Sequence, residues 1–486
     1  MTSRLAAYQG LLAFLVSASL LAGCGGRDAD AVWRLPNRDL AGTRAAAGSA
    51  IDAGNVARLE VRWRYGLTAA PTYSGIHAST PVVDGATVYV QDLQSNVYAL
   101  DRPTGELLWA HRYRAPNEGP NGLALDGEQV YGATDSDAFA LDRESGRELW
   151  RRHLTGPTEQ FVDVAPVVRD GLVFLSTIGF APGGRGAIYA LDAGTGAVRW
   201  KFVTIRDAWR YPLEAGGGGL WFPVSIDSEG RLYGGNSNPA PWGGTRTRPN
   251  GGAFPGPALW TDSLLVLHAE TGQLLWYDQV TPHDVRDYDF QATPMVAGEL
   301  VIGAGKAGRV IAWDRGTRER VWEATVGVHR NDTGPLPRQR VTVCPGLLGG
   351  VETPMAFADG RLFVPVVDLC GWGSAVDRQE LTSLDPSQGR GRLVALDAAT
   401  GRTLWERQLP SPDFGCATVS NDVVFTSTFD GMVYALATGD GRILWQAQMR
   451  AGINACPAVV GDLLLLGAGV RQPNGDVPEL VAFGLP

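Results

Sequence analysis

The sequence has almost no lysine. Lys201 and Lys306 are the only lysines in a chain of 486 residues that carries 42 Lys and Arg together, so nearly all of its positive charge is arginine. The formal net charge is −9, which argues against a protein that binds the phosphate backbone of nucleic acids. Beyond the N-terminus the sequence lacks apolar runs long enough to cross a bilayer, which argues against a polytopic membrane protein. The hydrophobic content of 44% is ample for a packed core and excludes a disordered chain.

The N-terminus carries the pattern of an export signal. Arg4 precedes an apolar run of signal-peptide length over residues 11–21, and the run ends in Leu21-Ala-Gly-Cys24. This ending resembles the bacterial lipobox, in which cleavage leaves a lipid-modified cysteine as the first residue. We therefore expect a lipoprotein signal peptide at 1–23, an anchor and linker at 24–57, and a protein held by Cys24 on the extracytoplasmic face of a bacterial membrane, in the periplasm or at the cell surface. The alternative is a plain secretory signal with an incidental cysteine.

Cysteine is also scarce, with four residues besides Cys24, and their spacing matches no zinc motif. An exported protein can keep disulfides. Cys416 and Cys456 occupy similar positions in neighbouring repeats, which favours a bond between them and leaves Cys344 to pair with Cys370. Four buried thiols are the alternative.

Tryptophan is abundant by contrast, with 15 residues, and much of it belongs to an internal repeat. The first copy reads Tyr98-Ala-Leu-Asp101-x-x-Thr104-Gly105-x-x-x-Trp109. In every copy eight positions separate the aspartate, or the residue in its place, from the tryptophan. The further copies run over residues 142–150, 192–200, 268–276, 314–322, 397–405 and 437–445. A repeat of this kind indicates one supersecondary unit used many times.

Each unit reads as four short strands of alternating apolar and polar residues bounded by Gly and Asp turns. Units of about forty residues with four strands are blades of a β-propeller. Trp63 lies in an outer strand with no blade before it, and the chain end 479–483 is an inner strand with no outer strand after it. The sequence therefore predicts an all-β protein, an eight-bladed β-propeller of four-stranded antiparallel blades over residues 58–486, with the ring closed by the N-terminal strand.

Two insertions and a turn are expected to meet at one mouth of the ring. In an up-and-down blade, the loop between strands 2 and 3 lies on the same face as the link to the next blade. That face would gather carboxylates, an amide and a lysine, which suit a hard cation or proton abstraction beside a stabilised oxyanion. Asp and Asn in such loops also cap turns, which is the alternative for each residue singly. The residues are Asn238, His283, Asp284, Asp287, Asp289, Lys306 and Glu352.

The repeat resembles that of the pyrroloquinoline quinone (PQQ) dehydrogenases and related propellers, over nearly the whole chain after the signal. Three site segments are also similar: Asn238-Pro-Ala-Pro-Trp242, Thr281-Pro-His-Asp-x-x-Asp287 and the turn at Lys306. The resemblance implies that Asn238 and Asp287 bind a metal, that Asp287 is also the catalytic base, and that Lys306 contacts the quinone. It implies Asp289 as a further metal ligand of the lanthanide-dependent branch, and Trp221 as the floor under the quinone.

The sequence departs from the family pattern along one edge of the cofactor site. Ala181 stands where the family has a metal-ligating Glu. The vicinal cysteine pair is absent, and the segment Glu118-Gly-Pro-Asn121 occupies its place. Asn121 aligns with the Arg that binds a cofactor carboxylate in the family. The residues that grip the cofactor carboxylates are therefore missing, whereas those on the metal side are present.

The resemblance implies an oxidoreductase acting on an alcohol, aldose or similar hydroxyl substrate, with PQQ and calcium or a lanthanide as cofactors. The sequence contains no Cys-x-x-Cys-His haem motif, so electrons would leave through a separate acceptor. The alternative is a non-catalytic scaffold similar to the outer-membrane assembly lipoprotein, with no cofactor and with a protein partner at the loop-rich mouth. A small-ligand sensor that uses the same mouth is a third hypothesis.

Overall fold

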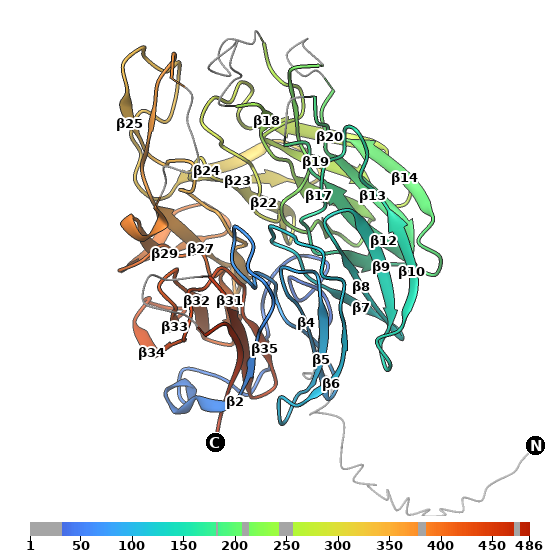
Figure 1. The fold of residues 1–486 in the computed structure, drawn as a ribbon. Coiled ribbons are helices and arrows are strands. Elements are labelled where there is room, and N and C mark those ends of the chain that lie inside the picture. The colour runs from blue at the N-terminus through green and yellow to red at the C-terminus, as the bar shows by residue number, and fades with distance from the viewer. Residues whose placement is uncertain (1–31, 181–182, 207–212, 243–255, 378–384, 471–476) are drawn as a thin grey trace, which may run out of the picture.

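The computed structural model describes residues 32–180, 183–206, 213–242, 256–377, 385–470 and 477–486, and these form a ring of eight antiparallel sheets (Figure 1). The chain passes around the ring in sequence order, so that red β37 ends beside blue β2 in Figure 1. The eight-bladed propeller predicted from the repeat is confirmed. The predicted signal peptide and Cys24 lie outside the described residues.

Each blade has four strands, numbered from the axis outward, because each unit of the repeat supplies three turns. Blades 1 to 4 are β3 (Val82–Asp84), β4 (Thr87–Gln91), β5 (Val97–Asp101) and β6 (Leu107–His111); β7 (Ala124–Asp126), β8 (Gln129–Ala133), β9 (Asp137–Asp142) and β10 (Glu148–His153); β11 (Val167–Arg169), β12 (Leu172–Thr177), β13 (Ala187–Asp192) and β14 (Val198–Val203); and β16 (Ser225–Ile226), β17 (Arg231–Gly235), β19 (Ser263–His268) and β20 (Leu274–Gln279).

The second half of the ring follows the same plan. Blades 5 to 8 are β21 (Met295–Ala297), β22 (Leu300–Ala304), β23 (Arg309–Asp314) and β24 (Arg320–Thr325); β26 (Ala356–Ala358), β27 (Arg361–Asp368), β29 (Arg390–Asp397) and β30 (Thr403–Leu409); β31 (Thr418–Ser420), β32 (Val423–Ser427), β33 (Met432–Ala437) and β34 (Ile443–Gln448); and β35 (Ala458–Val460), β36 (Leu463–Ala468), β37 (Glu479–Gly484) and β2 (Glu60–Gly66).

A few short elements lie outside this plan. β1 (Val32–Trp33) adds a fifth strand to blade 1, on the axial side of β3. The two insertions form small hairpins, β15 (Gly216–Gly217) with β18 (Pro239–Ala240), and β25 (Val341–Val343) with β28 (Gly371–Gly373). Two 3₁₀ turns are η1 (Val56–Arg58) and η4 (Pro386–Gln388). In the described part of the chain, no helix is both long and apolar enough to cross a membrane.

The ring closes by pairing the two ends of the propeller sequence. β2 is the outer strand of blade 8 and pairs antiparallel with β37, with Trp63 opposite Ala482 and Tyr65 opposite Leu480. This is the closure expected from the unpartnered Trp63 and the chain end. It removes the exposed edges that an open sheet would leave for aggregation.

The repeat tryptophans bind neighbouring blades together. Trp150 on β14's neighbour β10 donates from Nε1 to the carbonyl oxygen of Ala193 in blade 3 at 2.8 Å. Its ring covers Gly196, whose φ of +67° is readily adopted only by glycine. The same packing of a tryptophan ring on a turn glycine occurs at Gly105, Gly146, Gly272, Gly401 and Gly441. The repeat thus encodes one interlock for each junction between blades where these residues are present.

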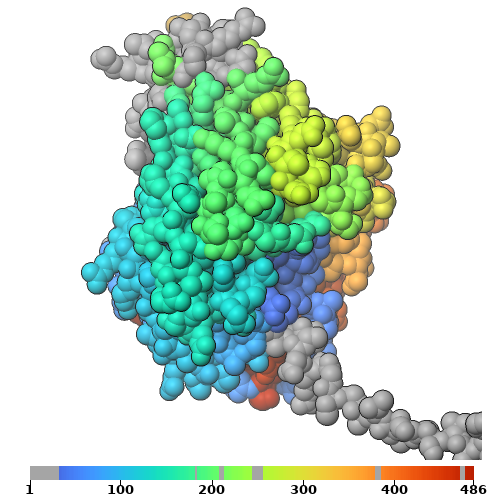
Figure 2. Space-filling model, turned by 90° about the vertical axis from the view of Figure 1, so that its right-hand side faces the viewer, coloured from blue at the N-terminus to red at the C-terminus, as the bar shows by residue number. Residues whose placement is uncertain are grey.

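The segment 32–51, which we call the N-terminal belt, runs across the face opposite the insertions. Its backbone carbonyls accept hydrogen bonds from the innermost strands of successive blades, as in Ile226 N to Leu40 O at 2.7 Å and Phe357 N to Thr43 O at 2.9 Å. Figure 2 shows blue residues of the N-terminal part of the chain lying against the teal and green blades. The belt therefore supplies partners for backbone groups that the blades leave unpaired.

Arg44 is the centre of this belt and is fully buried. Its guanidinium stacks over the ring of Trp33 at 5.6 Å, and burial lowers the pKa of Arg44 to about 9. Five acceptors receive its hydrogen bonds: the carbonyl oxygens of Pro36, Ala417 and Pro457, Asn37 Oδ1 and Thr418 Oγ1. One arginine thus ties the belt to the links before blades 7 and 8.

Two disulfides connect the links on the mouth side. Cys344 is bonded to Cys370 at the base of the β25–β28 hairpin, and Cys416 is bonded to Cys456 across the links that precede blades 7 and 8. The pairing is the one favoured by the repeat positions, and it sets aside the alternative of four free thiols.

Candidate functional site

Three loops from blades 4 and 5 converge at the mouth of the ring. Asn238 lies in the insertion between β17 and β19, Asp287 and Asp289 in the link between β20 and β21, and Lys306 in the turn between β22 and β23. Gly305 allows this approach, because a Cβ atom there would lie 2.1 Å from the carbonyl oxygen of Asp289. The loops are joined by their backbones as well, since Lys306 N donates to Asp289 O at 3.0 Å.

The side chains of these loops form one hydrogen-bonded cluster, which we call the carboxylate cluster: Asn238, Asp287, Asp289 and Lys306. Lys306 Nζ lies 2.8 Å from Asp287 Oδ2 and 2.7 Å from Asp289 Oδ2. Asn238 donates from Nδ2 to Asp287 Oδ1 at 2.5 Å and from its backbone N to Asp289 Oδ1 at 2.7 Å. Asp287, Asp289 and Lys306 are 6%, 1% and 8% exposed, so the charges are held in the interior.

The backbone of the link aims Asp287 at the cluster. Asp287 has φ of +67°, in the left-handed region that side-chain-bearing residues rarely adopt. Asp284 holds this conformation, since its two carboxylate oxygens accept from the backbone N of Arg286 and of Tyr288, each at 2.8 Å. Asp284 therefore acts on the link and not on the cavity, as the capping alternative anticipates.

Burial sets the electrostatics of the cluster. Burial raises the pKa of Asp287 to about 7, although the charge of Lys306 lowers it and that of Asp289 raises it. Burial alone would lower the pKa of Lys306, but the charges of Asp287, Asp289 and Glu352 hold it well above its usual value. A carboxylate that titrates near neutral pH beside a fixed ammonium is the arrangement expected of a general base.

Glu352, from the link before blade 6, extends the cluster on one side. Gln291 donates from Nε2 to Glu352 Oε2 at 2.7 Å and to its carbonyl oxygen at 2.8 Å. Burial raises the pKa of Glu352 to about 8, against the charge of Lys306. Sequence reasoning placed Glu352 at the mouth but missed Gln291, which stands two positions after Asp289.

A cavity of about 200 Å³ opens beside Lys306 and Glu352. Trp221 also lines it, from the loop between β15 and β16, and so do Glu118 and Gly119 from the link before blade 2. The structure therefore brings Trp221 and Lys306, the two predicted cofactor contacts, to one cavity. The segment Glu118–Asn121, which the sequence identifies as the departure from the family pattern, forms its opposite edge.

Polar atoms around this cavity are buried and have no partner in the described part of the chain. They are Trp221 Nε1, Glu352 Oε1 and Thr353 Oγ1. Buried polar groups are nearly always satisfied, so these atoms point to a polar ligand. One donor, two acceptors and a flat indole fit the oxygen-rich plane of a quinone on this side. Thr353 had no motif to announce it.

The edge of the cavity at Asn121 fits a carboxylated ligand less well. Asn121 donates from Nδ2 to Asp92 O at 2.8 Å, and its Oδ1 is buried without a partner. No arginine lines the cavity among the residues described, and Glu118 adds a carboxylate. Ala181, at the place of the family's ligating Glu, lies outside the described residues.

The metal ligands predicted from sequence are close together, but Lys306 lies between two of them. Within the described ranges, no three His, Cys, Asp or Glu side chains are arranged to hold a metal ion. The two carboxylates and the carboxamide supply the oxygen atoms that a hard cation prefers. The donor set thus fits a calcium or lanthanide ion once the Lys306 ammonium is elsewhere.

Asp262 is a further buried carboxyl behind the cluster that sequence reasoning missed. It is fully buried, and neither of its side-chain oxygens has a partner. Burial and then the charges of Asp284, Asp289 and Asp287 raise its pKa well above the usual value. Its sequence context, Trp260-Thr-Asp-Ser263, reads only as the start of a strand, so no signal marked it.

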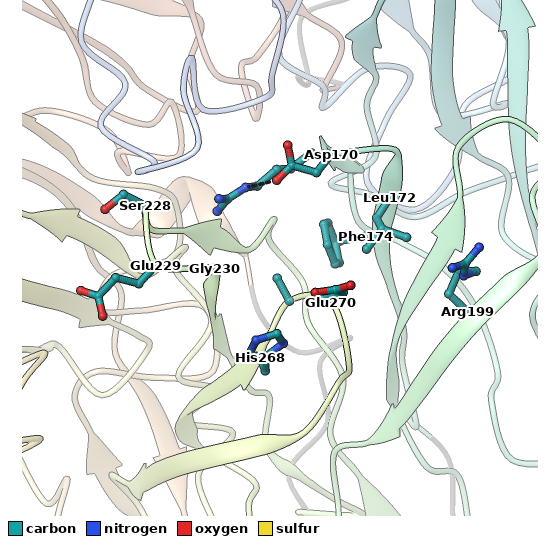
Figure 3. Close-up of a pocket in the computed structure, with 11 residues that line it drawn as sticks. Asp170, Leu172, Phe174, Arg199, Ser228, Glu229, Gly230, His268 and Glu270 are labelled. Atoms are coloured by element: carbon teal, nitrogen blue, oxygen red, sulfur yellow. Dashed lines mark hydrogen bonds and ion pairs between the residues drawn. The ribbon is translucent and has the colours of Figure 1, made fainter.

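Other cavities lie apart from the cluster. His283 lines a cavity of about 730 Å³ on the outer side of the same link, with Val285, Tyr288 and Leu336, and it accepts or donates at Gly256 O over 2.9 Å. On the opposite face, a cleft of about 460 Å³ separates the turns of blades 3 and 4 (Figure 3). Figure 3 shows His268 and Glu270 on one side of this cleft and Asp170 on the other. Neither cavity joins the predicted catalytic residues.

Comparison with protein families agrees with the repeat. A family model described as "Outer membrane protein assembly factor BamB" matches residues 27–152, 94–209 and 340–479, and one described as "Glucose/ethanol/alcohol dehydrogenase, beta-propeller domain" matches residues 163–306. The chain belongs to the PQQ-repeat β-propeller family.

Individual relatives include quinohemoprotein alcohol dehydrogenases. The chain is 29% identical over 311 residues to "Quinohemoprotein alcohol dehydrogenase ADH IIB" of Pseudomonas putida, covering 57% of this chain and 44% of the relative. It is 27% identical over 487 residues to the "Quinohemoprotein alcohol dehydrogenase" of Comamonas testosteroni, covering 82% of this chain and 66% of the relative. The chain thus spans about half to two thirds of the length of these relatives.

Solved structures show the same fold. The quinohemoprotein alcohol dehydrogenase ADHIIG from Pseudomonas putida superposes with a TM-score of 0.81 at 22% identity, covering 94% of this chain and 80% of that one. A europium-containing methanol dehydrogenase gives 0.78 at 21% identity, covering 94% and 98%. BamB from Moraxella catarrhalis gives 0.55 at 14% identity, covering 88% and 97%.

Proposed function

We propose that the mouth of this propeller is the active site of a quinoprotein-type dehydrogenase that oxidises a small hydroxyl substrate. The observation that carries the proposal is the position of Asp287, a buried carboxylate bonded to Asn238 and Lys306 next to the cavity that Trp221 and Lys306 line. The named activities of the two quinohemoprotein relatives support it.

The residues of the chain have distinct roles in this reaction. Asp287 takes the hydroxyl proton of the substrate, because its raised pKa matches a base that works near neutral pH. Lys306 stabilises negative charge that develops on oxygen, since its ammonium is fixed in a site with little water. Trp221 provides a flat apolar surface for a ring system. Asn238, Asp287 and Asp289 would hold a calcium or lanthanide ion.

PQQ, held against Trp221 and Lys306, would supply the acceptor for the hydride. Electrons then pass to a separate acceptor protein or small molecule. The acidic edge at Glu118 and Asn121 makes this site differ from one with an arginine there, and we expect PQQ affinity to depend strongly on the cation.

The test is reconstitution of the full chain with PQQ and either calcium or lanthanum. We expect a shifted quinone absorbance and reduction of an electron-accepting dye with simple alcohols or aldoses. Asp287→Asn should lower turnover by a factor of about 10³ or more while quinone binding persists. Asp126→Asn, at an exposed carboxylate of β7, is the matched control. Failure to bind PQQ with either metal would reject the proposal.

Export and anchoring complete the proposal. We propose that Cys24 carries acyl chains that keep the propeller on the extracytoplasmic face of a bacterial membrane. Metabolic labelling with an alkyne fatty acid should mark the wild type but not Cys24→Ala, and Cys24→Ala should move to the soluble fraction. Labelling of the variant, or its retention on membranes, would contradict this step.

A non-catalytic scaffold is the second candidate, favoured by the family model described as BamB that matches three stretches of the chain. In that case the loop-rich mouth binds a protein partner and the carboxylate cluster serves to hold the loops. Crosslinking in native membranes from a photoreactive residue at Val376, a half-exposed position beside the β25–β28 hairpin, should then capture one defined partner. A chain recovered alone, together with PQQ binding, would reject the scaffold.

A further inference from the structure

The carboxylate cluster is complete without any added ion. All four side-chain oxygens of Asp287 and Asp289 have a donor from the chain: Lys306 Nζ serves one oxygen of each at 2.8 and 2.7 Å, and Asn238 serves the other two at 2.5 and 2.7 Å. A metal ion that used these oxygens would have to take the place of a donor that is already there.

Lys306 is the donor whose charge a metal ion could replace. Its ammonium is 8% exposed and lies between two buried carboxylates, so its departure would leave two negative charges unpaired in the interior. An unpaired buried charge is strongly unfavourable, so the ammonium can leave only when another cation arrives. The occupancy of this position by Lys306 and by a metal ion is therefore mutually exclusive.

The structure also offers a place for the displaced ammonium. Lys306 lines the cavity of about 200 Å³ together with Trp221 and Glu352. Backbone hydrogen bonds from Lys306 N to Asp289 O and from Gly308 N to Gly305 O, both 3.0 Å, hold the turn in place. The long flexible stem of lysine allows the ammonium alone to move. Glu352 Oε1, which has no partner, faces the same region of charge.

We propose that Lys306 is a resident cation that exchanges with a calcium or lanthanide ion, and that the exchange delivers its ammonium to the cavity to bind an anionic or carbonyl oxygen of the ligand. This inference rests on the proposed function. It makes cation binding and oxyanion binding cooperative, because each favours the same position of Lys306. It also means that the chain keeps its carboxylate cluster neutralised before the metal arrives.

Direct titration of the full chain with calcium or terbium tests the exchange. Calorimetry and terbium luminescence would compare the wild type with Lys306→Gln, which removes the competing charge but keeps a polar side chain. We expect Lys306→Gln to bind either ion about tenfold more tightly or better, since a unit charge at contact distance is worth at least that factor. Lys201→Gln is the matched control, because the only other lysine pairs with Glu159 away from the mouth. Its affinity for the ions should equal that of the wild type.

The scarcity of lysine permits a second measurement that needs no variant at Lys306. Incorporation of lysine labelled with ¹³C at Cε gives two resonances in the mature chain, and Lys201→Arg assigns them. Addition of calcium should shift the Lys306 resonance and leave that of Lys201 in place. Addition of PQQ afterwards should shift Lys306 again, and the affinity for PQQ should rise with calcium in the wild type but not in Lys306→Gln.

The outcomes separate this inference from the function on which it rests. Equal or weaker ion binding by Lys306→Gln, or a Lys306 resonance that does not respond while the wild type binds calcium, overturns the exchange and leaves the dehydrogenase proposal standing. Binding of neither ion by wild type or variant rejects the cation site itself, and with it both proposals.

Discussion

The ring of Trp150 covers Gly196 of the next blade so closely that a Cβ atom on Gly196 would lie 2.5 Å from Trp150 Cε3. The contact explains why the repeat pairs a tryptophan with a glycine of the following copy. The glycine supplies the left-handed turn, and its missing side chain leaves room for the indole. Blade 5 lacks this glycine, since Arg318 stands at its place with φ of +69°, and there Trp313 donates from Nε1 to Asp278 Oδ2 at 2.6 Å instead.

Gly196→Ala should weaken the ring more than the backbone change alone would. The left-handed backbone costs an alanine roughly 1 kcal/mol, and the forced contact with Trp150 adds about 1–3 kcal/mol. Gly171→Ala is the matched control in the same blade, with φ of +74° and nothing within 4 Å of its Cβ position. Chemical denaturation followed by tryptophan fluorescence would compare the two. Equal losses of stability would contradict the interlock.

The blades could be predicted because their signal is local and repeated. The Asp-to-Trp spacing recurs along the chain, and the unpartnered Trp63 implied a partner at the C-terminal end, which β2 and β37 provide. The N-terminal belt could not be predicted in the same way. Its bonds to the blades run between backbone atoms, as from Phe357 N to Thr43 O, and leave no periodic pattern in the side chains.

The site was predictable to the level of which loops meet. Propeller topology places the loop of Asn238, the link of Asp287 and the turn of Lys306 on one face, whatever their side chains do. The position of Lys306 between Asp287 and Asp289 depends on side-chain packing across blades, which no spacing reveals. The unpartnered carboxyl of Asp262 likewise becomes visible only when burial is known.

Arg44→Gln should destabilise the protein by about 3 kcal/mol or more. The change leaves several of the five buried acceptors of the guanidinium without a donor, and an unsatisfied buried group costs about 1–3 kcal/mol. The glutamine also loses the stacking on Trp33. Arg58→Gln, at an exposed position of η1, is the control and should be neutral. Thermal unfolding would measure both, and equal midpoints would exclude Arg44 as the tie of the belt.

Glu352→Gln should reduce the dependence of stability on pH. The folded protein raises the pKa of Glu352 from 4.5 to about 8, so the folded state binds this proton more tightly than the unfolded state. That group therefore stabilises the fold at pH below about 4.5, and the contribution is lost as pH rises to about 8. Each such group changes the free energy of unfolding by up to about 1.4 kcal/mol per pH unit within this window.

The glutamine does not titrate, so the variant should lose less stability than the wild type between pH 5 and pH 8. It keeps an acceptor for Gln291 Nε2, which preserves the contact that holds this side chain. Glu128→Gln, an exposed glutamate in the β7–β8 turn, should follow the wild-type profile. Denaturation midpoints at pH 5, 6, 7 and 8 would measure this. Parallel profiles for wild type and Glu352→Gln would show that the carboxyl does not retain its proton in the folded state.

The pH profile of turnover should report Asp287. A general base must be deprotonated to accept the hydroxyl proton, and the folded protein raises the pKa of Asp287 from 3.8 to about 7. In the free enzyme kcat/KM should therefore increase about tenfold per pH unit below pH 7 and level off above it. Dye-linked turnover of the reconstituted chain at fixed cation concentration, from pH 5 to pH 8.5, would measure the profile, with the quinone absorbance as a control for cofactor loss. A rate that stays constant over this range would exclude Asp287 as a base with a raised pKa, because its protonation would then have no effect on the chemistry.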